Sequence, residues 1–173
     1  MRKKYSKNTL KNKLKGIKML LLDVDGVLTD GKLVYNNNGI ELKMFDVKDG
    51  YGLVRLKKAG IRTGIITAKM SDIVETRSKD LGMDVLYQNV DNKLTAYNAV
   101  KRRFKLTDGE IAYIGDDIPD LPVLRQAGMP IAVSNAVDAV KNASVYVTKK
   151  SGGNGAVREV VELITQAKGI PMS

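Results

Sequence analysis

Two acids, Asp23 and Asp25, are the first residues in the chain whose type and spacing could do chemistry. A short apolar run, residues 19–22, leads straight into Asp23, and Gly26 directly follows Asp25. Strand interiors disfavour Asp, and neighbouring carboxylates repel each other, so such a pair needs a compensating cation. Side chains at positions i and i+2 of a strand project to the same side, which lets both acids face one cavity.

Three later segments place polar side chains at the ends of predicted strands. Thr67 ends the second strand, Lys93 opens the helix after the third, and residues 115–120 follow the fourth. The last segment holds three acids, Asp116, Asp117 and Asp120. Each of these residues alone has an ordinary role as a helix cap or a solvated side chain. Ligands of open α/β sheets bind beyond the carboxyl ends of the strands, so their joint occurrence there favours one site.

The composition restricts what this site can hold. The chain has neither His nor Cys, which excludes a Ser-His-Asp triad, the usual zinc sites and disulfides. A cation bound by acids alone is hard and takes oxygen ligands, and Mg²⁺ binds through one or two carboxylates, water and a substrate phosphate. We therefore expect a Mg²⁺ site formed by Asp23, Asp25 and Asp116.

These parts indicate phosphoryl transfer. Asp23 is placed to attack phosphorus, and Asp25 to protonate the leaving alcohol and later to accept a proton from water. The phosphoryl oxygens would be held by the Thr67 hydroxyl, the Lys93 ammonium and backbone N–H groups nearby, that of Ala68 included.

The rest of the chain predicts the scaffold. Short apolar runs alternate with segments of helical period, which is typical of βαβ units and a parallel sheet between two helical layers. The predicted strands are 18–23, 61–67, 84–88, 111–115, 129–133 and 144–147, and the predicted helices are 50–59, 70–81, 92–104, 118–127, 135–141 and 155–168. Residues 32–46 read as a β-hairpin around an Asn-Asn-Asn-Gly turn. The fold class is thus α/β, a Rossmann-like three-layer sandwich with a projecting hairpin and no cap domain.

The charge is unevenly distributed. The formal net charge is +10, and residues 1–18 carry eight basic residues and no acid. We therefore divide the chain into a basic tail, 1–16, and one domain, 17–173. The tail reads as a solvated helix, a disordered arm or a segment that steers acidic partners. It lacks interleaved aromatic residues apart from Tyr5, so we expect no nucleic-acid partner. The short apolar runs predict neither a secretion signal nor a membrane span, and we expect a cytoplasmic protein.

Four motifs in order resemble the haloacid dehalogenase superfamily of phosphotransferases. DVDGVLTDG (residues 23–31) is similar to its first motif, Thr67 to the second, Lys93 to the third and GDDIPD (115–120) to the fourth. A narrower resemblance spans most of residues 17–169 and points to one capless branch. It rests on KDGYG (48–52), LGMD (81–84), YQNVDNK (87–93) and GGNGAVRE (152–159).

This branch implies a Mg²⁺-dependent phosphatase for an anionic sugar phosphate, the 8-phosphate of an eight-carbon 3-deoxy sugar acid of lipopolysaccharide. It also implies a homotetramer in which hairpins form a central barrel and neighbouring subunits complete each active site. By resemblance, Asp23 is the nucleophile, Asp25 the acid/base and a metal ligand through its carbonyl, and Asp116 the third protein ligand. Asp117 and Asp120 would support the metal site.

The substrate-binding residues match less closely. Ala68-Lys69 stands where the family usually has Gly-Arg, and related phosphatases for nine-carbon sugar acids tend to have Glu in place of Lys69. A cation there favours the eight-carbon substrate. Arg77 resembles a family arginine that reaches the sugar carboxylate from a neighbouring subunit. The alternatives are a nine-carbon ulosonate 9-phosphate substrate of the sialic acid type, or a non-catalytic oligomerisation or regulatory domain.

Overall fold

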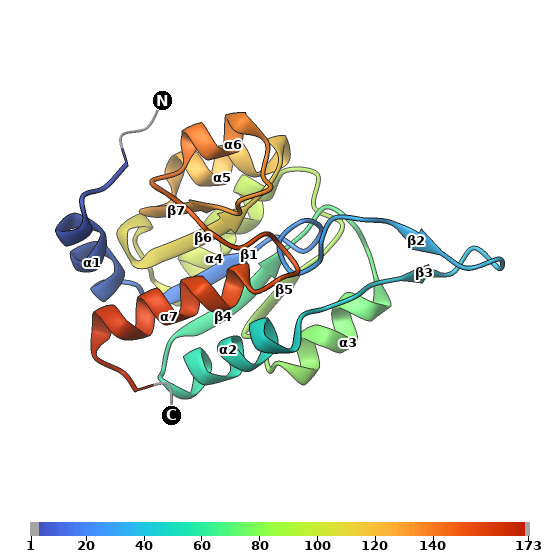
Figure 1. Ribbon diagram of the computed structural model, residues 1–173, viewed down its shortest axis with the longest axis horizontal. Coiled ribbons are helices and arrows are strands. Elements are labelled where there is room, and N and C mark those ends of the chain that lie inside the picture. Colours follow the sequence, from blue (N-terminus) through green and yellow to red (C-terminus); the bar gives the residue numbers. More distant parts are fainter. Residues whose placement is uncertain (1–3, 172–173) are drawn as a thin grey trace.

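A six-stranded parallel sheet forms the centre of the molecule (Figure 1), as described by a computed structural model for residues 4–171. In spatial order the strands are β5 (Val85–Tyr87), β4 (Arg62–Ile66), β1 (Met19–Leu22), β6 (Ile111–Gly115), β7 (Met129–Ala132) and β8 (Tyr146–Val147). Numbered within the sheet this is the order 3-2-1-4-5-6. The winding reverses between β1 and β6, which is where doubly wound sheets open a crevice for ligands.

Helices cover both faces of the sheet, as the alternating pattern predicts. One face carries α2 (Val47–Lys58), α3 (Asp72–Asp80) and α7 (Ala156–Lys168), and the other carries α4 (Lys93–Phe104), α5 (Leu121–Gln126) and α6 (Asp138–Ala143) (Figure 1). Two short 3₁₀ turns, Asp108–Glu110 and Ile118–Asp120, flank β6. The chain adds strands on one side of β1, up to β5, and then on its other side, from β6 to β8. Because the crossovers are right-handed, these two directions place the connecting helices on opposite faces of the sheet. The three-layer prediction is confirmed.

The predicted element boundaries shift by a few residues. Helix α2 begins at Val47 rather than at position 50, because Asp46 caps it by accepting a hydrogen bond from the Lys48 N–H at 2.6 Å. The last strand, predicted over 144–147, pairs only through Tyr146–Val147.

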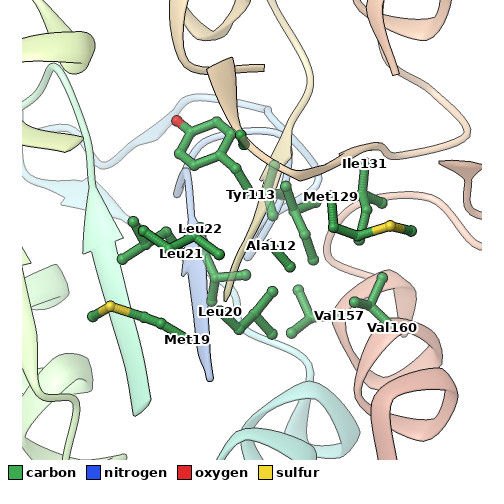
Figure 2. Close-up of a cluster of buried hydrophobic side chains, with 14 of the residues drawn as sticks. Met19, Leu20, Leu21, Leu22, Ala112, Tyr113, Met129, Ile131, Val157 and Val160 are labelled. Atoms are coloured by element: carbon green, nitrogen blue, oxygen red, sulfur yellow. The ribbon is translucent and has the colours of Figure 1, made fainter. Parts of the chain in front are cut away.

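The core is aliphatic and centred on β1. All four residues of β1 are fully buried, and Leu20 and Leu22 pair in register with Ala112 and Ile114 of β6. Figure 2 shows Leu20 and Ala112 close to Val157 of α7, while the Tyr113 ring lies apart from them with its hydroxyl pointing away from the aliphatic cluster. A strand buried on both faces reads as a continuous apolar run, which is why MLLL needs no alternation.

The predicted hairpin is present but its strands are short. β2 (Val34–Tyr35) pairs with β3 (Glu41–Leu42), and the pair projects away from the sheet (Figure 1). The Asn36 carboxamide oxygen closes the turn by accepting from the N–H groups of Asn38 and Ile40, both at 2.9 Å. Within residues 4–171 no cap domain is inserted beside this hairpin.

The basic N-terminal segment is partly built into the fold. Helix α1 (Lys7–Lys15) packs along α7, with Leu14 only 2% exposed. Lys168 Nζ donates to the Lys15 carbonyl at 2.7 Å. Residues 7–15 therefore form a helix whose basic side chains are exposed, in line with a solvated helix, while the burial of Leu14 excludes a disordered arm over these residues. Residues 1–3 of the predicted tail lie outside the described residues, and the division at residue 16 stays a prediction.

None of the helices in the described part of the chain combines the length and apolar composition that a membrane crossing needs.

Candidate active site

The predicted site residues meet in one cleft at the carboxyl end of the sheet. It has a volume of about 250 Å³. Its lining comprises Asp23, Asp25, Gly31, Thr67, Ala68, Lys69, Lys93, Asp116, Asp117 and Pro119. Four separate strand-to-helix connections, those after β1, β4, β5 and β6, thus contribute to a single cavity, as the topology of a doubly wound sheet dictates.

The floor of the cleft is a buried ion triplet. Lys93 Nζ lies 2.8 Å from Asp23 Oδ2 and 2.7 Å from Asp120 Oδ1. The Lys93 side chain is 3% exposed and that of Asp120 is fully buried. Lys93 reaches this position because it opens α4, whose first turn is capped by Asn92, with the Leu94 N–H donating to the Asn92 side chain. Charges at this depth are stable only when they are paired and hydrogen-bonded.

Asp120 uses both of its carboxylate oxygens within the protein. Oδ1 accepts from Lys93 and from the Tyr113 hydroxyl at 2.6 Å, and Oδ2 accepts from the backbone N–H groups of Asp116 and Asp117 at 2.9 and 3.3 Å. With four donors already bound, this carboxylate orients its neighbours and holds Lys93 in place.

Burial and charge crowding shift the pKa values of the acids. Burial, reinforced by the Asp120 charge and opposed by Lys93, raises the pKa of Asp23 to about 7. Burial and then the charges of Asp23 and Asp120 raise the pKa of Asp116 to about 7. Burial would lower the pKa of Lys93, but Asp23 and Asp120 more than offset it and the net shift is upward. The cleft therefore holds the positively charged ammonium of Lys93 beside two acids, Asp23 and Asp116, whose negative charges it compensates only in part.

The close approach of the loops after β1 and β6 requires glycine at position 26. A Cβ on Gly26 would overlap the Asp116 carboxylate, and the residue also has φ +88°, which disfavours other side chains. Gly26 thus lets Asp116 lie against the loop that carries Asp23 and Asp25.

The donor set fits a divalent cation. Ligand atoms of Asp23, Asp116 and Asp120 lie within 4.8 Å of one another. Asp116 Oδ1 is buried and has no hydrogen-bond partner within residues 4–171, so this oxygen is free for a metal. Asp120 belongs to this cluster in addition to the predicted ligands, but its oxygens already accept four hydrogen bonds. Asp23 and Asp116 therefore remain the carboxylate ligands that fit best, and a Mg²⁺ ion would relieve their mutual repulsion.

The Asp25 side chain faces a different partner, which the sequence did not indicate. Its Oδ1 lies 2.5 Å from Lys43 Nζ, and the same ammonium lies 3.2 Å from Glu41 Oε1. Glu41 in turn lies 3.5 Å from Lys69 Nζ. Acidic and basic side chains thus alternate from Asp25 to the predicted substrate-binding residue Lys69. Glu41 and Lys43 are two positions apart in the sequence, but only the tertiary structure shows that both side chains turn toward Asp25 and Lys69.

Arg77 is the predicted site residue that the chain does not bring into its own cleft. Its guanidinium lies over the Phe45 ring, 5.4 Å from the centroid, and packs against Gly50 at the start of α2. A Cβ at position 50 would overlap this guanidinium, so the glycine of the KDG motif makes room for Arg77. The predicted role of Arg77 towards a neighbouring subunit stays a prediction.

Comparisons with known proteins agree with this geometry. Residues 62–160 match the model of a family described as haloacid dehalogenase-like hydrolases. A 3-deoxy-D-manno-octulosonate 8-phosphate phosphatase of Escherichia coli is 42% identical over 157 residues, which cover 91% of this chain and 84% of the relative.

Solved structures show the same likeness. The phosphatase of that name from Moraxella catarrhalis, solved with magnesium, phosphate and KDO, is 45% identical, with a TM-score of 0.92 over 95% of this chain and 94% of its own. A cobalt-bound form of the Haemophilus influenzae phosphatase is 41% identical, with a TM-score of 0.87 over 91% of this chain and 92% of its own. The chain therefore belongs to the haloacid dehalogenase-like hydrolases, in the group that contains the 3-deoxy-D-manno-octulosonate 8-phosphate phosphatases.

Proposed function

We propose that the protein is a Mg²⁺-dependent phosphatase that converts 3-deoxy-D-manno-octulosonate 8-phosphate to the free sugar acid and phosphate. The observation that carries this proposal is the cleft in which Asp23, Lys93 and the unpaired oxygen of Asp116 converge. The similarity to phosphatases of this name, over 91% of the chain, supports the choice of substrate. Lys69 lines the cleft and supplies a cation for an anionic sugar.

In the first step an oxygen of Asp23 attacks phosphorus and the bond from phosphorus to the sugar oxygen breaks. Asp25 donates a proton to the departing alkoxide, so the sugar leaves as a neutral alcohol. Lys93, 2.8 Å from Asp23, is placed to hold a phosphoryl oxygen as charge moves onto it. The products of this step are the free sugar acid and an aspartyl-phosphate on Asp23.

In the second step water attacks the phosphorus of the aspartyl-phosphate. Asp25, now a carboxylate, takes the proton from this water, and the bond between phosphorus and Asp23 breaks. Inorganic phosphate leaves and both acids regain their starting states. Asp23 and Asp116 would hold Mg²⁺, which supplies positive charge against the phosphate and keeps Asp23 ionised for attack.

Phosphate release from the eight-carbon 8-phosphate and a nine-carbon ulosonate 9-phosphate, with Mg²⁺ and with EDTA, tests this proposal. We expect Mg²⁺-dependent turnover with a preference for the eight-carbon substrate. Preference for the nine-carbon substrate would keep the mechanism and change the substrate. Absence of turnover on both sugar phosphates and on p-nitrophenyl phosphate would favour the non-catalytic alternative.

We further propose a homotetramer assembled through the hairpin. Its support is the exposed apolar surface of this segment: Leu33 51%, Val34 44%, Tyr35 56%, Ile40 56%, Leu42 51% and Met44 81%. Exposed apolar side chains gathered in one segment are typical of an interaction site. Light scattering after gel filtration should give the mass of four chains. Leu42→Glu should reduce that mass, and Lys58→Glu on α2 should not.

A cytoplasmic location is also part of the proposal, supported by a fold that has no Cys and needs no oxidising compartment. Fractionation of cells that express the tagged protein tests it, and recovery in a periplasmic fraction would contradict it.

A further inference from the structure

We propose that Lys43, carried by the hairpin, is a positioning residue for the acid/base Asp25. This inference rests on the phosphatase function proposed above. It means that the hairpin orients a side chain of the active site in its own subunit, in addition to any role in assembly.

The contact is short and sheltered. Lys43 Nζ lies 2.5 Å from Asp25 Oδ1, and the Lys43 side chain is 2% exposed, against 27% for Asp25. Glu41 Oε1, 3.2 Å away, holds the same ammonium from a second side. Two acceptors on one part-buried ammonium restrict its position more than one acceptor would, so the direction of the Asp25 carboxylate is restricted as well.

A second ion pair nearby, Lys32 with Asp30, is exposed and serves for comparison. Lys32 and Asp30 lie 3.1 Å apart, with side chains 80% and 41% exposed. Exposed pairs contribute little to stability, whereas removal of one partner of a buried pair leaves the other charge uncompensated. The Lys43–Asp25 pair is part-buried and thus more sheltered than the Lys32–Asp30 pair, and its acid is the proposed proton carrier.

The Lys43–Asp25 contact also attaches the base of the hairpin to the loop after β1. The hairpin ladder has only two residue pairs, Val34 with Leu42 and Tyr35 with Glu41. A two-stranded ribbon of this size is marginal by itself. Lys43 directly follows the ladder, so the ion pair with Asp25 fastens the hairpin to the loop after β1.

The contact with Lys43 fixes which oxygen of Asp25 is available for proton transfer. The ammonium binds Oδ1, which leaves Oδ2 to carry the proton that moves to the leaving oxygen and later returns from water. A carboxyl group free to rotate would spend less time with Oδ2 directed at that oxygen, and misplacement by about 1 Å can lower a rate about 100-fold.

The test uses the full-length protein with Mg²⁺ and single-turnover rates, with enzyme in excess over two substrates. The 8-phosphate of 3-deoxy-D-manno-octulosonate has an alkoxide leaving group that needs a proton, while p-nitrophenyl phosphate releases a stable phenolate that does not. We expect Lys43→Met to slow cleavage of the sugar phosphate about 10- to 100-fold and release of nitrophenolate less than about 3-fold. Lys43→Arg, which restores the charge, should recover most of the loss. Lys32→Met is the matched control and should leave both rates unchanged.

A double-mutant cycle adds a readout that a purely structural role would not produce. Because Lys43 acts through Asp25, Lys43→Met should slow the sugar phosphate reaction little further in an Asp25→Asn background. Equal losses on both substrates, or additive losses in the cycle, would overturn the inference and make Lys43 a stability element. If Lys43→Met does not fold, Lys43→Gln, which also removes the charge, carries the test: a loss confined to the sugar phosphate supports the inference, and any other result overturns it. Failure of the unsubstituted protein on both substrates would instead count against the proposed function.

Discussion

Lys93 and Asp23 form a buried ion pair, with 2.8 Å between Nζ and Oδ2, at the point where the sheet reverses its winding. The pair joins the start of α4 to the end of β1, and Asp120 holds the far side of the ammonium at 2.7 Å. The proposed nucleophile, the proposed phosphate-binding cation and a supporting acid are thus held together by contacts within the protein, so we expect little reorganisation during the reaction.

Replacement of the proposed nucleophile, Asp23, should remove turnover and keep the fold. Asp23→Asn preserves the shape of the side chain but weakens the nucleophile, and we expect kcat to fall at least about 1,000-fold. Phosphate release measures the loss, and circular dichroism checks the fold. Asp30→Asn, at an exposed acid in the same loop, should retain activity. Substantial turnover by pure Asp23→Asn protein would mean that another group attacks phosphorus.

The support role of Asp120 should appear in stability. Asp120→Asn removes the charge that compensates Lys93 and turns one acceptor into a donor that faces other donors. We expect the free energy of unfolding to fall by about 3 kcal/mol, measured by urea denaturation. Asp117→Asn is the matched control, because Asp117 caps Ile118 from an exposed position and Asn caps equally well. A loss of equal size in both variants would contradict the special role of Asp120.

Arg77 should affect the sugar acid more than the phosphate. It lies outside the cleft of its own chain, so a direct role requires a neighbouring subunit. We expect Arg77→Ala to lower kcat/KM for the sugar phosphate at least about 10-fold, which corresponds to the loss of one hydrogen bond to a charged group. The value of kcat/KM for p-nitrophenyl phosphate should fall less than about 3-fold. Lys79→Ala, on the same helix at an exposed position, should change neither value. Equal losses on the two substrates would place Arg77 in the phosphate site or in the packing of α2 and α3.

Metal removal should make stability fall as pH rises. Burial raises the pKa values of Asp23 and Asp116 to about 7 in the metal-free protein, from an ordinary 3.8. Between about pH 4 and 7 the folded state therefore binds more protons than the unfolded state, so the free energy of unfolding decreases with pH. Mg²⁺ competes with these protons, and its stabilising effect should be largest above pH 7.

Melting temperatures from pH 5 to 8, with EDTA and with Mg²⁺, measure this dependence. Burial also raises the pKa of Asp49 to about 6, with the same sign, so Asp49→Asn separates its share from that of the cleft. A melting temperature in EDTA that increases with pH across this range would contradict the raised pKa values.

Much of the architecture and the chemistry follows from the order of residues alone. The continuous apolar run before Asp23 is typical of a strand buried on both faces, and acids, a hydroxyl and an amine at the ends of successive parallel strands meet at one edge of the sheet. Local signals of this kind act over a few residues, so the amino-acid sequence suffices to predict that Asp23, Thr67, Lys93 and Asp116 lie together.

Only the tertiary structure decides the contacts that depend on how distant segments close on each other. The Lys43–Asp25 pair depends on how the base of the hairpin lies against the loop after β1, and the burial of Leu14 depends on the docking of α1 against α7. Asp120 is a support with four donors because Tyr113, Lys93 and two backbone N–H groups converge on it from three elements. Such contacts arise from packing between segments far apart in the chain, and no local periodicity encodes them.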